Sequence, residues 1–190
     1  MIIDVSEALG RCVEALTMGG TIIYPTETLY GIGADYTNAR AVASVRALKR
    51  RPLEKNFNVI VDSIDTARRY FVVTRDVEKL VAAFMPGPLT LIVENKESGT
   101  TAFRISSHPF ARELCKRFKK PIVSTTVNMS CEQPLSKIHE ISAAFDDRVA
   151  VIVDAGDLPT AQPSTVFDVA TRQLFRNGRI SLSDIMACLA

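Results

Sequence analysis

Four segments of the chain carry polar or cationic side chains where a connecting loop does not require them. The first is Thr26-Glu27-Thr28 with Tyr30, directly after the β-prone run 21–24. Hydroxyls and a carboxylate at the end of a strand could hold a small zwitterion. A Pro-Thr turn that caps the next element is an equally good interpretation, and the local sequence leaves both open.

Cations dominate the second segment, Lys49-Arg50-Arg51-Pro52, with Lys55 close behind. The planar fork of Arg51 and the point charge of Lys49 both suit phosphate oxygens. The alternative is a solvated helix C-terminus, where cations complement the helix dipole. That situation is the commoner one in proteins.

The third and fourth segments are polar positions in or after apolar strands. Arg104 interrupts the apolar run 102–105, so it either faces solvent or pairs with an anion such as a substrate carboxylate. Hydroxyl and amide side chains fill residues 124–130, where an open α/β sheet binds ligands. Alternation along a strand predicts Ser124 and Thr126 on one side and Thr125 on the other. A hydrogen-bonded turn is the alternative.

Familiar nucleotide and nucleophile motifs are missing from the sequence, which has no P-loop, no GxGxxG and no GxSxG. We expect His108 and His139 to be structural or solvated. No cysteines form a CxxC pair, so a zinc site is not expected. We predict buried thiols in a reducing compartment at the cysteines, which are Cys12, Cys115, Cys131 and Cys188.

The composition is that of an ordinary globular domain. The 190 residues are 47% hydrophobic and 23% charged, which excludes disorder and predicts one domain over residues 1–190. No apolar run approaches 18 residues and the N-terminus lacks a signal-peptide layout, so we expect a cytoplasmic protein without a membrane span. The net charge of +2 is too small to indicate a nucleic-acid partner by itself.

Periodicity interleaves helices and strands along the whole chain. A capping box of Asp4 and Glu7 predicts a helix over residues 5–16, and Ser181 with Asp184 predicts a cap for a final helix. The other predicted helices are 39–49, 65–84 as one or two helices, 109–118 and 137–145. The predicted strands are 21–24, 57–61, 89–93, 102–105, 121–125, 149–153, 164–169 and 173–176. This order favours one α/β unit with helices packed on a sheet.

Taken together, these segments resemble the YrdC-like threonylcarbamoyl-AMP synthase family, in its short single-domain form. The resemblance runs from Gly20 to about Ile180. It is carried by Tyr-Pro-Thr-Glu-Thr-Leu-Tyr-Gly-Ile-Gly at 24–33, Lys-Arg-Arg-Pro at 49–52, Pro-Gly-Pro-Leu-Thr at 86–90, Phe-Arg-Ile at 103–105, Ser-Thr-Thr-Val-Asn at 124–128, Pro-Ser-Thr-Val at 163–166 and Phe-Arg-Asn-Gly at 175–178. Each motif is weak alone, but their shared order is specific.

The resemblance implies a twisted mixed or parallel sheet, flanked by helices, with a basic concave cleft. It implies a nucleotidyltransferase that condenses L-threonine, bicarbonate and ATP to threonylcarbamoyl-AMP and pyrophosphate. A partner transferase would then move the threonylcarbamoyl group to tRNA. Mg²⁺ would accompany the triphosphate, without ligands from protein side chains.

The resemblance also implies roles for individual residues. Lys49 and Arg51 would grip the ATP phosphates and carry catalysis by positioning and charge neutralisation. Threonine would be bound by Thr26, Arg104, Ser124 and Ser164. The nucleotide side would be completed by Thr126, Asn128, Ser136 and Arg176.

Two other functions remain open on the sequence alone. A module that binds double-stranded RNA or tRNA without catalysis would show salt-sensitive RNA affinity and consume no ATP. Another carbamoyl-adenylate enzyme, related to hydrogenase maturation factors, would usually carry additional domains.

Overall fold

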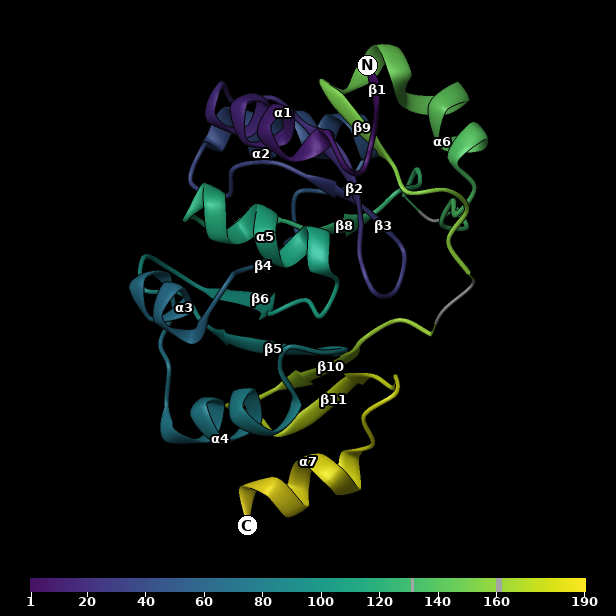
Figure 1. Cartoon of the computed structure of the whole chain (residues 1–190). Helices are drawn as coiled ribbons and strands as arrows, with labels where there is room; N and C mark the ends of the chain where they lie inside the picture. Colours follow the sequence, from purple (N-terminus) through teal and green to yellow (C-terminus); the bar gives the residue numbers. More distant parts are fainter. Residues whose placement is uncertain (131, 160–161) are drawn as a thin grey trace.

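The strands of the computed structural model, which describes residues 1–130, 132–159 and 162–190, form two mixed sheets (Figure 1). The first sheet has the order β1-β9-β2-β3-β8. β9 runs parallel to both β1 and β2, whereas β2 and β3 form an antiparallel hairpin. Its strands are β1 (Ile2–Asp4), β2 (Ile22–Pro25), β3 (Tyr30–Gly33), β8 (Thr125–Thr126) and β9 (Val151–Asp154).

The second sheet has the order β11-β10-β5-β6-β4-β7 and lies below the first in Figure 1. β5 pairs parallel with β10 and antiparallel with β6. Its strands are β4 (Asn58–Ile60), β5 (Leu89–Glu94), β6 (Thr100–Arg104), β7 (Ile122–Val123), β10 (Thr165–Asp168) and β11 (Gln173–Arg176). The prediction of a single sheet was therefore wrong, although the α/β class is correct.

The chain passes from one sheet to the other at Ser124. The predicted strand 121–125 is divided here, because β7 pairs with β4 whereas β8 pairs with β3. The Ser124 amide donates to the Asn58 carbonyl at 2.8 Å, and the Val123 amide donates to the Ala34 carbonyl at 2.9 Å. A bridge between Asp35 and Ile122 joins the two sheets at the same point.

Helices bury both faces of the first sheet. α1 (Ala8–Thr17) and α5 (Pro109–Phe118) share one apolar cluster with side chains of β2 and β9. α2 (Ala39–Lys49) and α6 (Ile138–Phe145) pack on the opposite side against Ile23, Ile32 and Ile152. This sandwich follows from the alternation of side chains along each strand, which directs neighbours such as Ile22 and Ile23 to opposite faces.

The second sheet has its own core with three further helices. α3 (Ile64–Tyr70), α4 (Arg75–Phe84) and α7 (Leu182–Leu189) cover buried side chains of β5, β6 and β10, including Leu91, Phe103 and Phe167. A short 3₁₀ turn, η1 (Asp146–Arg148), follows α6. Within the described ranges, we find no helix long and apolar enough to cross a membrane.

The observed helix caps can be compared with the predicted ones. α2 matches its predicted bounds because the Asn38 side chain accepts from the amides of Arg40 and Ala41, while Arg50 ends the helix in the left-handed region. The Ser181–Asp184 capping box of α7 is confirmed. The predicted capping box of Asp4 and Glu7 is wrong, because Asp4 ends β1 and Glu7 is the N-cap of α1. The strand β1 was not predicted from the sequence.

The thiol prediction is confirmed in part. Cys12 and Cys115 are buried free thiols, whereas Cys188 is half-buried. Cys131 lies outside the described residues.

Candidate functional site

The hairpin between β2 and β3 carries the first predicted segment. Thr26 is buried, and its hydroxyl donates to the Leu29 carbonyl at 2.6 Å. The same oxygen accepts from the amides of Thr28 and Leu29, each at 3.3 Å. The interpretation of this segment as a hydroxyl-stabilised turn is thus confirmed, and the turn holds Thr28 and Leu29 in a fixed position.

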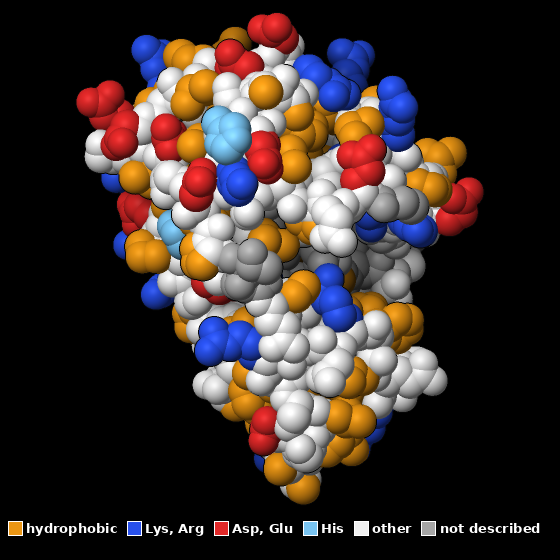
Figure 2. Space-filling model, turned by 90° about the vertical axis from the view of Figure 1, so that its right-hand side faces the viewer, with side chains coloured by type: hydrophobic (Ala, Val, Ile, Leu, Met, Phe, Trp, Pro, Cys, Tyr) orange, Lys and Arg blue, Asp and Glu red, His pale blue; other side chains and the backbone are white. Residues whose placement is uncertain are grey.

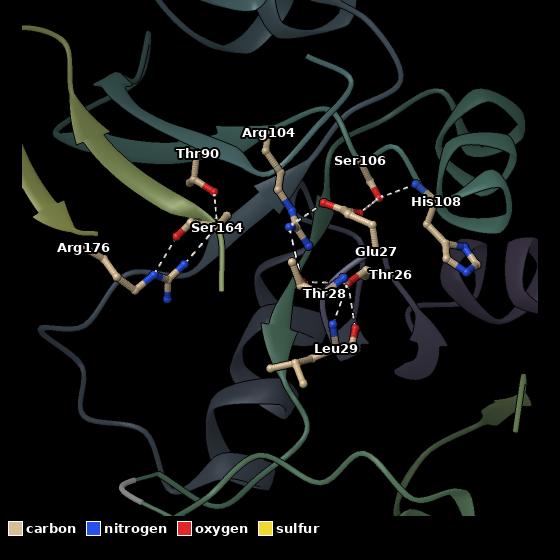
Figure 3. A network of polar contacts seen from close by, with 10 residues as sticks. All are labelled: Thr26, Glu27, Thr28, Leu29, Thr90, Arg104, Ser106, His108, Ser164 and Arg176. Atoms are coloured by element: carbon tan, nitrogen blue, oxygen red, sulfur yellow. Dashed lines mark hydrogen bonds and ion pairs between the residues drawn. The ribbon is translucent and has the colours of Figure 1, made fainter. Parts of the chain in front are cut away.

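Arg104 ends β6 as a buried cation, only 8% exposed, so the solvent-facing alternative is excluded. One guanidinium nitrogen, Nη1, lies 2.8 Å from the Glu27 carboxylate and 3.5 Å from the Thr28 hydroxyl. The Ser106 hydroxyl donates to the other carboxylate oxygen of Glu27 (Figure 3). Glu27 therefore neutralises and orients Arg104. No protein group in the described chain bonds its Nε or Nη2, which are therefore available to a ligand.

Ser164 stands directly before β10 and joins two neighbouring strands. Its hydroxyl lies 2.8 Å from the Thr90 hydroxyl of β5 and accepts from Arg176 Nη2 at 2.9 Å. Arg176 Nε donates to the Ser164 carbonyl at 2.8 Å, which fixes the guanidinium against the segment (Figure 3). Burial, and secondarily the charge of Arg104, lowers the Arg176 pKa.

These segments enclose one cavity of about 190 Å³. Its described lining holds three arginines and no carboxylate residue, so the surface is basic and rich in hydroxyls. Ser124, Thr125 and Thr126 all contribute to the lining. The alternation of their side chains stays a prediction. The predicted site residues in the lining are Thr26, Arg51, Arg104, Ser124, Thr126, Ser164 and Arg176.

Lys49 is buried and binds backbone and amide oxygens of the chain after β8. It is 1% exposed, and its ammonium donates to the Thr126 carbonyl at 2.5 Å, the Asn128 carbonyl at 2.9 Å and the Asn128 Oδ1 at 2.6 Å. Those three bonds use its three N–H groups. Burial, with a contribution from the Arg51 charge, lowers the Lys49 pKa to about 8. In this conformation Lys49 holds the backbone of Thr126 and Asn128 in place.

Arg51 is held on a local loop and reaches the cavity. Its Nε donates to the Lys55 carbonyl at 3.1 Å, and its Nη2 donates to the Asn56 carbonyl at 2.7 Å. The guanidinium lies 5.0 Å from the centre of the Phe57 ring. Its pKa is lowered by burial and by Arg46.

Three of the predicted nucleotide residues lie outside the cavity lining. Lys49 and Asn128 are bonded to each other, and Asn128 also accepts from the Thr126 hydroxyl at 2.8 Å. Ser136 is half-buried, and its carbonyl accepts from the Leu158 amide at 3.0 Å. Their assignment to ATP stays a prediction.

The site contains residues whose contacts the sequence did not predict. The Glu27 carboxylate was considered only as a possible ligand of a small zwitterion, and neither Thr90 nor Ser106 was singled out. Thr90 offered a usable signal, because a hydroxyl inside the apolar run 89–93 needs a partner when it is buried. Glu27 offered none, since its partner Arg104 lies 77 positions away.

The chain is similar to curated proteins over most of its length. Threonylcarbamoyl-AMP synthase of Photorhabdus laumondii is 31% identical over 188 residues, covering 92% of this chain and 98% of that protein. The protein of the same name from Aliivibrio fischeri is 32% identical over 182 residues, with 90% and 98% covered.

Solved structures agree with the fold. P. abyssi Sua5 complexed with L-threonine superposes with a TM-score of 0.92 at 25% identity, covering 100% of this chain and 61% of that one. E. coli YciO superposes with a TM-score of 0.84 at 23% identity, covering 97% of each chain, which supports the fold alone.

A family model for the Sua5/YciO/YrdC domain, described as "Telomere recombination", matches residues 14–178. The match spans most of the chain and includes every segment that lines the cavity. The chain therefore belongs to the Sua5/YciO/YrdC family.

Proposed function

We propose that this protein is a threonylcarbamoyl-AMP synthase, which condenses L-threonine, bicarbonate and ATP to threonylcarbamoyl-AMP and pyrophosphate. The observation that carries the proposal is the convergence of three arginines and several hydroxyls from separate segments on one small cavity. Relatives that this chain matches over nearly their full length are named for this activity. A structural relative was solved with L-threonine.

Threonine would bind first between β6 and the hairpin turn. Arg104 would receive its carboxylate through Nε and Nη2, because Glu27 occupies only Nη1. Thr26, Ser124 and Ser164 would surround the rest of the substrate with hydroxyl oxygens. In such a small cavity the amino acid would be largely dehydrated, which strengthens each of these contacts.

The chemistry then needs two bonds to form. The threonine ammonium group first loses a proton; the resulting amine attacks the bicarbonate carbon, the C–N bond forms, a C–O bond breaks with loss of water, and a carbamate results. A carbamate oxygen attacks the α-phosphorus of ATP, and the bond to the pyrophosphate leaving group breaks. Arg51 and Arg176 would neutralise the charge of the phosphates, and no covalent protein intermediate is required.

Lys49 would act mainly through the chain that it holds. Its three bonds to Thr126 and Asn128 orient the Thr126 hydroxyl beside the cavity. We retain Asn128 and Ser136 as candidates for the nucleotide side, reached as ATP extends beyond the small cavity. A conformational change that frees the Lys49 ammonium would add it to the phosphate ligands.

Mg²⁺ would accompany the ATP, since this ion prefers phosphate oxygens and water. The described residues hold no group of three His, Cys, Asp or Glu side chains suited to a metal. The hydroxyls of the cavity are oxygen donors compatible with the hydration shell of the ion. We further propose a cytoplasmic location and transfer of the product by a partner enzyme that modifies tRNA, with direct contact to tRNA or double-stranded RNA as a further candidate.

The test is direct synthesis by the purified protein. ATP, bicarbonate and labelled L-threonine should yield pyrophosphate and a threonylcarbamoyl adenylate. Arg104→Ala should raise the KM for threonine at least about tenfold, because it removes a charge-assisted carboxylate contact. Arg51→Ala should reduce kcat through lost phosphate neutralisation.

A matched control is Arg112→Ala, which removes an exposed arginine of α5 outside the cavity. Its kinetics should equal those of the wild type. Absence of any adenylate product at saturating threonine and ATP would refute the proposed function.

A further inference from the structure

A second and much larger hollow lies on the outer side of α2. It has a volume of about 1010 Å³ and is bounded by α2, the end of α3 and the turn between β5 and β6. Arg51 lines both this groove and the small cavity, but the other residues of the groove belong to neither the site nor its proposed chemistry. We call it the α2 groove.

Uncompensated positive charge surrounds the α2 groove. Its lining contains the cations Arg46, Arg50, Arg51, Arg69 and Lys96. None of these five forms an ion pair in the described chain, where the paired cations lie elsewhere. Glu97 is the single acidic residue in the described lining. Like charges gathered around one hollow repel each other unless an anion enters it.

Backbone carbonyls hold several of these cations in place without neutralising them. Arg46 donates to the Lys55 carbonyl at 3.1 Å, Arg69 to the Lys119 carbonyl at 3.1 Å, and Lys96 to the Arg68 carbonyl at 2.5 Å. The helix dipole explains why cations occur at Arg46 and Arg69, because these residues lie in the last turns of α2 and α3. The helix dipole does not explain Lys96, which lies in the loop between β5 and β6.

The groove also offers room and flat apolar surface. Ala39, Ala43 and Ala47 follow one another at four-residue spacing along α2, so this row of the helix presents only methyl groups to the groove. Tyr36 and Tyr70 lie half-buried in its lining. The Tyr36 hydroxyl is fixed by Thr101 at 2.9 Å and Asn95 at 2.7 Å, which immobilises the ring. Cations beside aromatic surface are the combination that binds phosphates and stacked bases.

We propose that the α2 groove binds a nucleoside phosphate, either free in solution or as a unit of an RNA strand. The phosphate lies among Arg50, Arg69 and Lys96, and the base rests against tyrosine and alanine surface. This inference stands on the groove alone and is independent of the proposed synthase reaction. Figure 2 shows one face of the molecule, on which Lys and Arg side chains are interspersed with acidic ones.

The chain has no tryptophan, so a single one placed in the groove reports on it selectively. Ala43→Trp puts the fluorophore on the exposed wall of α2, and bases that stack on indole quench it. The probes are ADP and a single-stranded oligoadenylate of ten nucleotides. We expect saturable quenching by at least one probe. ADP would indicate a free nucleotide, and quenching by the oligonucleotide alone would indicate an RNA strand.

Charge-reversal variants distinguish binding in the α2 groove from non-specific electrostatic attraction to the protein. Arg50→Glu with Arg69→Glu, added to Ala43→Trp, should weaken binding at least about tenfold, because two phosphate contacts are lost. Arg112→Glu with Lys116→Glu makes the same charge change on exposed positions of α5 and should alter affinity far less. Met18→Trp, at a position that is 81% exposed and outside the groove, should not be quenched saturably.

The wild-type chain provides a second measurement that does not depend on the inserted fluorophore. Anisotropy of the fluorescein-labelled oligoadenylate, measured with saturating unlabelled ATP to fill the proposed ATP site, should show binding that the groove charge reversal weakens and the α5 reversal retains. Failure of both probes to bind in the millimolar range would overturn the proposal. So would saturable quenching of the Ala43→Trp fluorophore that is unchanged by Arg50→Glu with Arg69→Glu.

Discussion

Lys49 combines almost complete burial with a cationic charge, and no carboxylate among the described residues pairs with it. Its pKa is lowered from 10.5 to about 8, chiefly by burial. Between these values the unfolded chain binds more protons than the folded chain, so this group's contribution to the free energy of unfolding rises with pH. The rise is at most about 1.4 kcal/mol per pH unit, and it is absent below the folded pKa.

Lys49→Met should remove this pH dependence. We therefore expect the wild type to gain stability relative to the variant as pH rises from 8 to 10. Urea unfolding of both proteins at unit steps of pH measures the difference and cancels the other titrating groups. If the difference in unfolding free energy between wild type and Lys49→Met stayed constant from pH 8 to 10, it would contradict the lowered pKa of Lys49.

Glu27 and Arg104 form a largely buried ion pair, in which the side chains are 15% and 10% exposed, respectively. Removing one partner leaves the other charge poorly hydrated, so Glu27→Gln and Arg104→Met should each cost about 2–3 kcal/mol of unfolding free energy. The double variant should cost less than the sum, with a coupling of at least about 1 kcal/mol. Denaturant unfolding of the four proteins measures it, and simple additivity would argue against coupling.

At the scale of elements, the turn after β11 fixes the wall that holds Ser164. The Thr165 hydroxyl donates to the Ile180 carbonyl at 2.7 Å and accepts from the Gly178 amide at 3.1 Å. A Cβ at Gly178 would lie 2.7 Å from the Ser164 carbonyl carbon and closer still to neighbouring backbone atoms. Since those atoms are backbone, the segment before β10 would have to move.

Gly178→Ala should therefore lower the free energy of unfolding by about 1–3 kcal/mol. It should also raise the KM for threonine, because Ser164 moves with the wall. The matched control is Gly10→Ala in α1, where nothing lies within 4 Å of the added Cβ. That change should instead stabilise by about 0.5–1 kcal/mol, since alanine favours the helix. A KM for threonine equal to that of the wild type would contradict the expected displacement of Ser164 in Gly178→Ala.

At the scale of the molecule, the two sheets meet at one crossing and share apolar clusters. Ile60 and Ile122 of the second sheet lie in the cluster of α1 and α5, and Val123 lies in that of α2 and α6. The β7–β8 segment pairs with both sheets, and the cavity takes residues from each. Because the sheets share this segment, we expect thermal unfolding in one transition, with a calorimetric enthalpy equal to the van't Hoff value. Scanning calorimetry tests this, and two resolved transitions would indicate that each sheet unfolds alone.

The sequence by itself determined the features that depend on near neighbours. Asn38 and Arg50 define α2 through bonds within a few residues, and Ser181 with Asp184 caps α7 in the same way. Apolar periodicity indicated most helices and strands. The ordered motifs identified the segments that now surround the cavity, including those of Arg104 and Ser164.

Only the tertiary structure decided which way those segments face. Whether Lys49 meets a phosphate or the carbonyls of Thr126 and Asn128 depends on groups 77 and 79 positions away. The partner of Arg104 and the change of sheet at Ser124 are likewise set by strands paired across long separations. Such pairings depend on how buried surfaces fit together, whereas caps and periodicity are short-range properties of the chain.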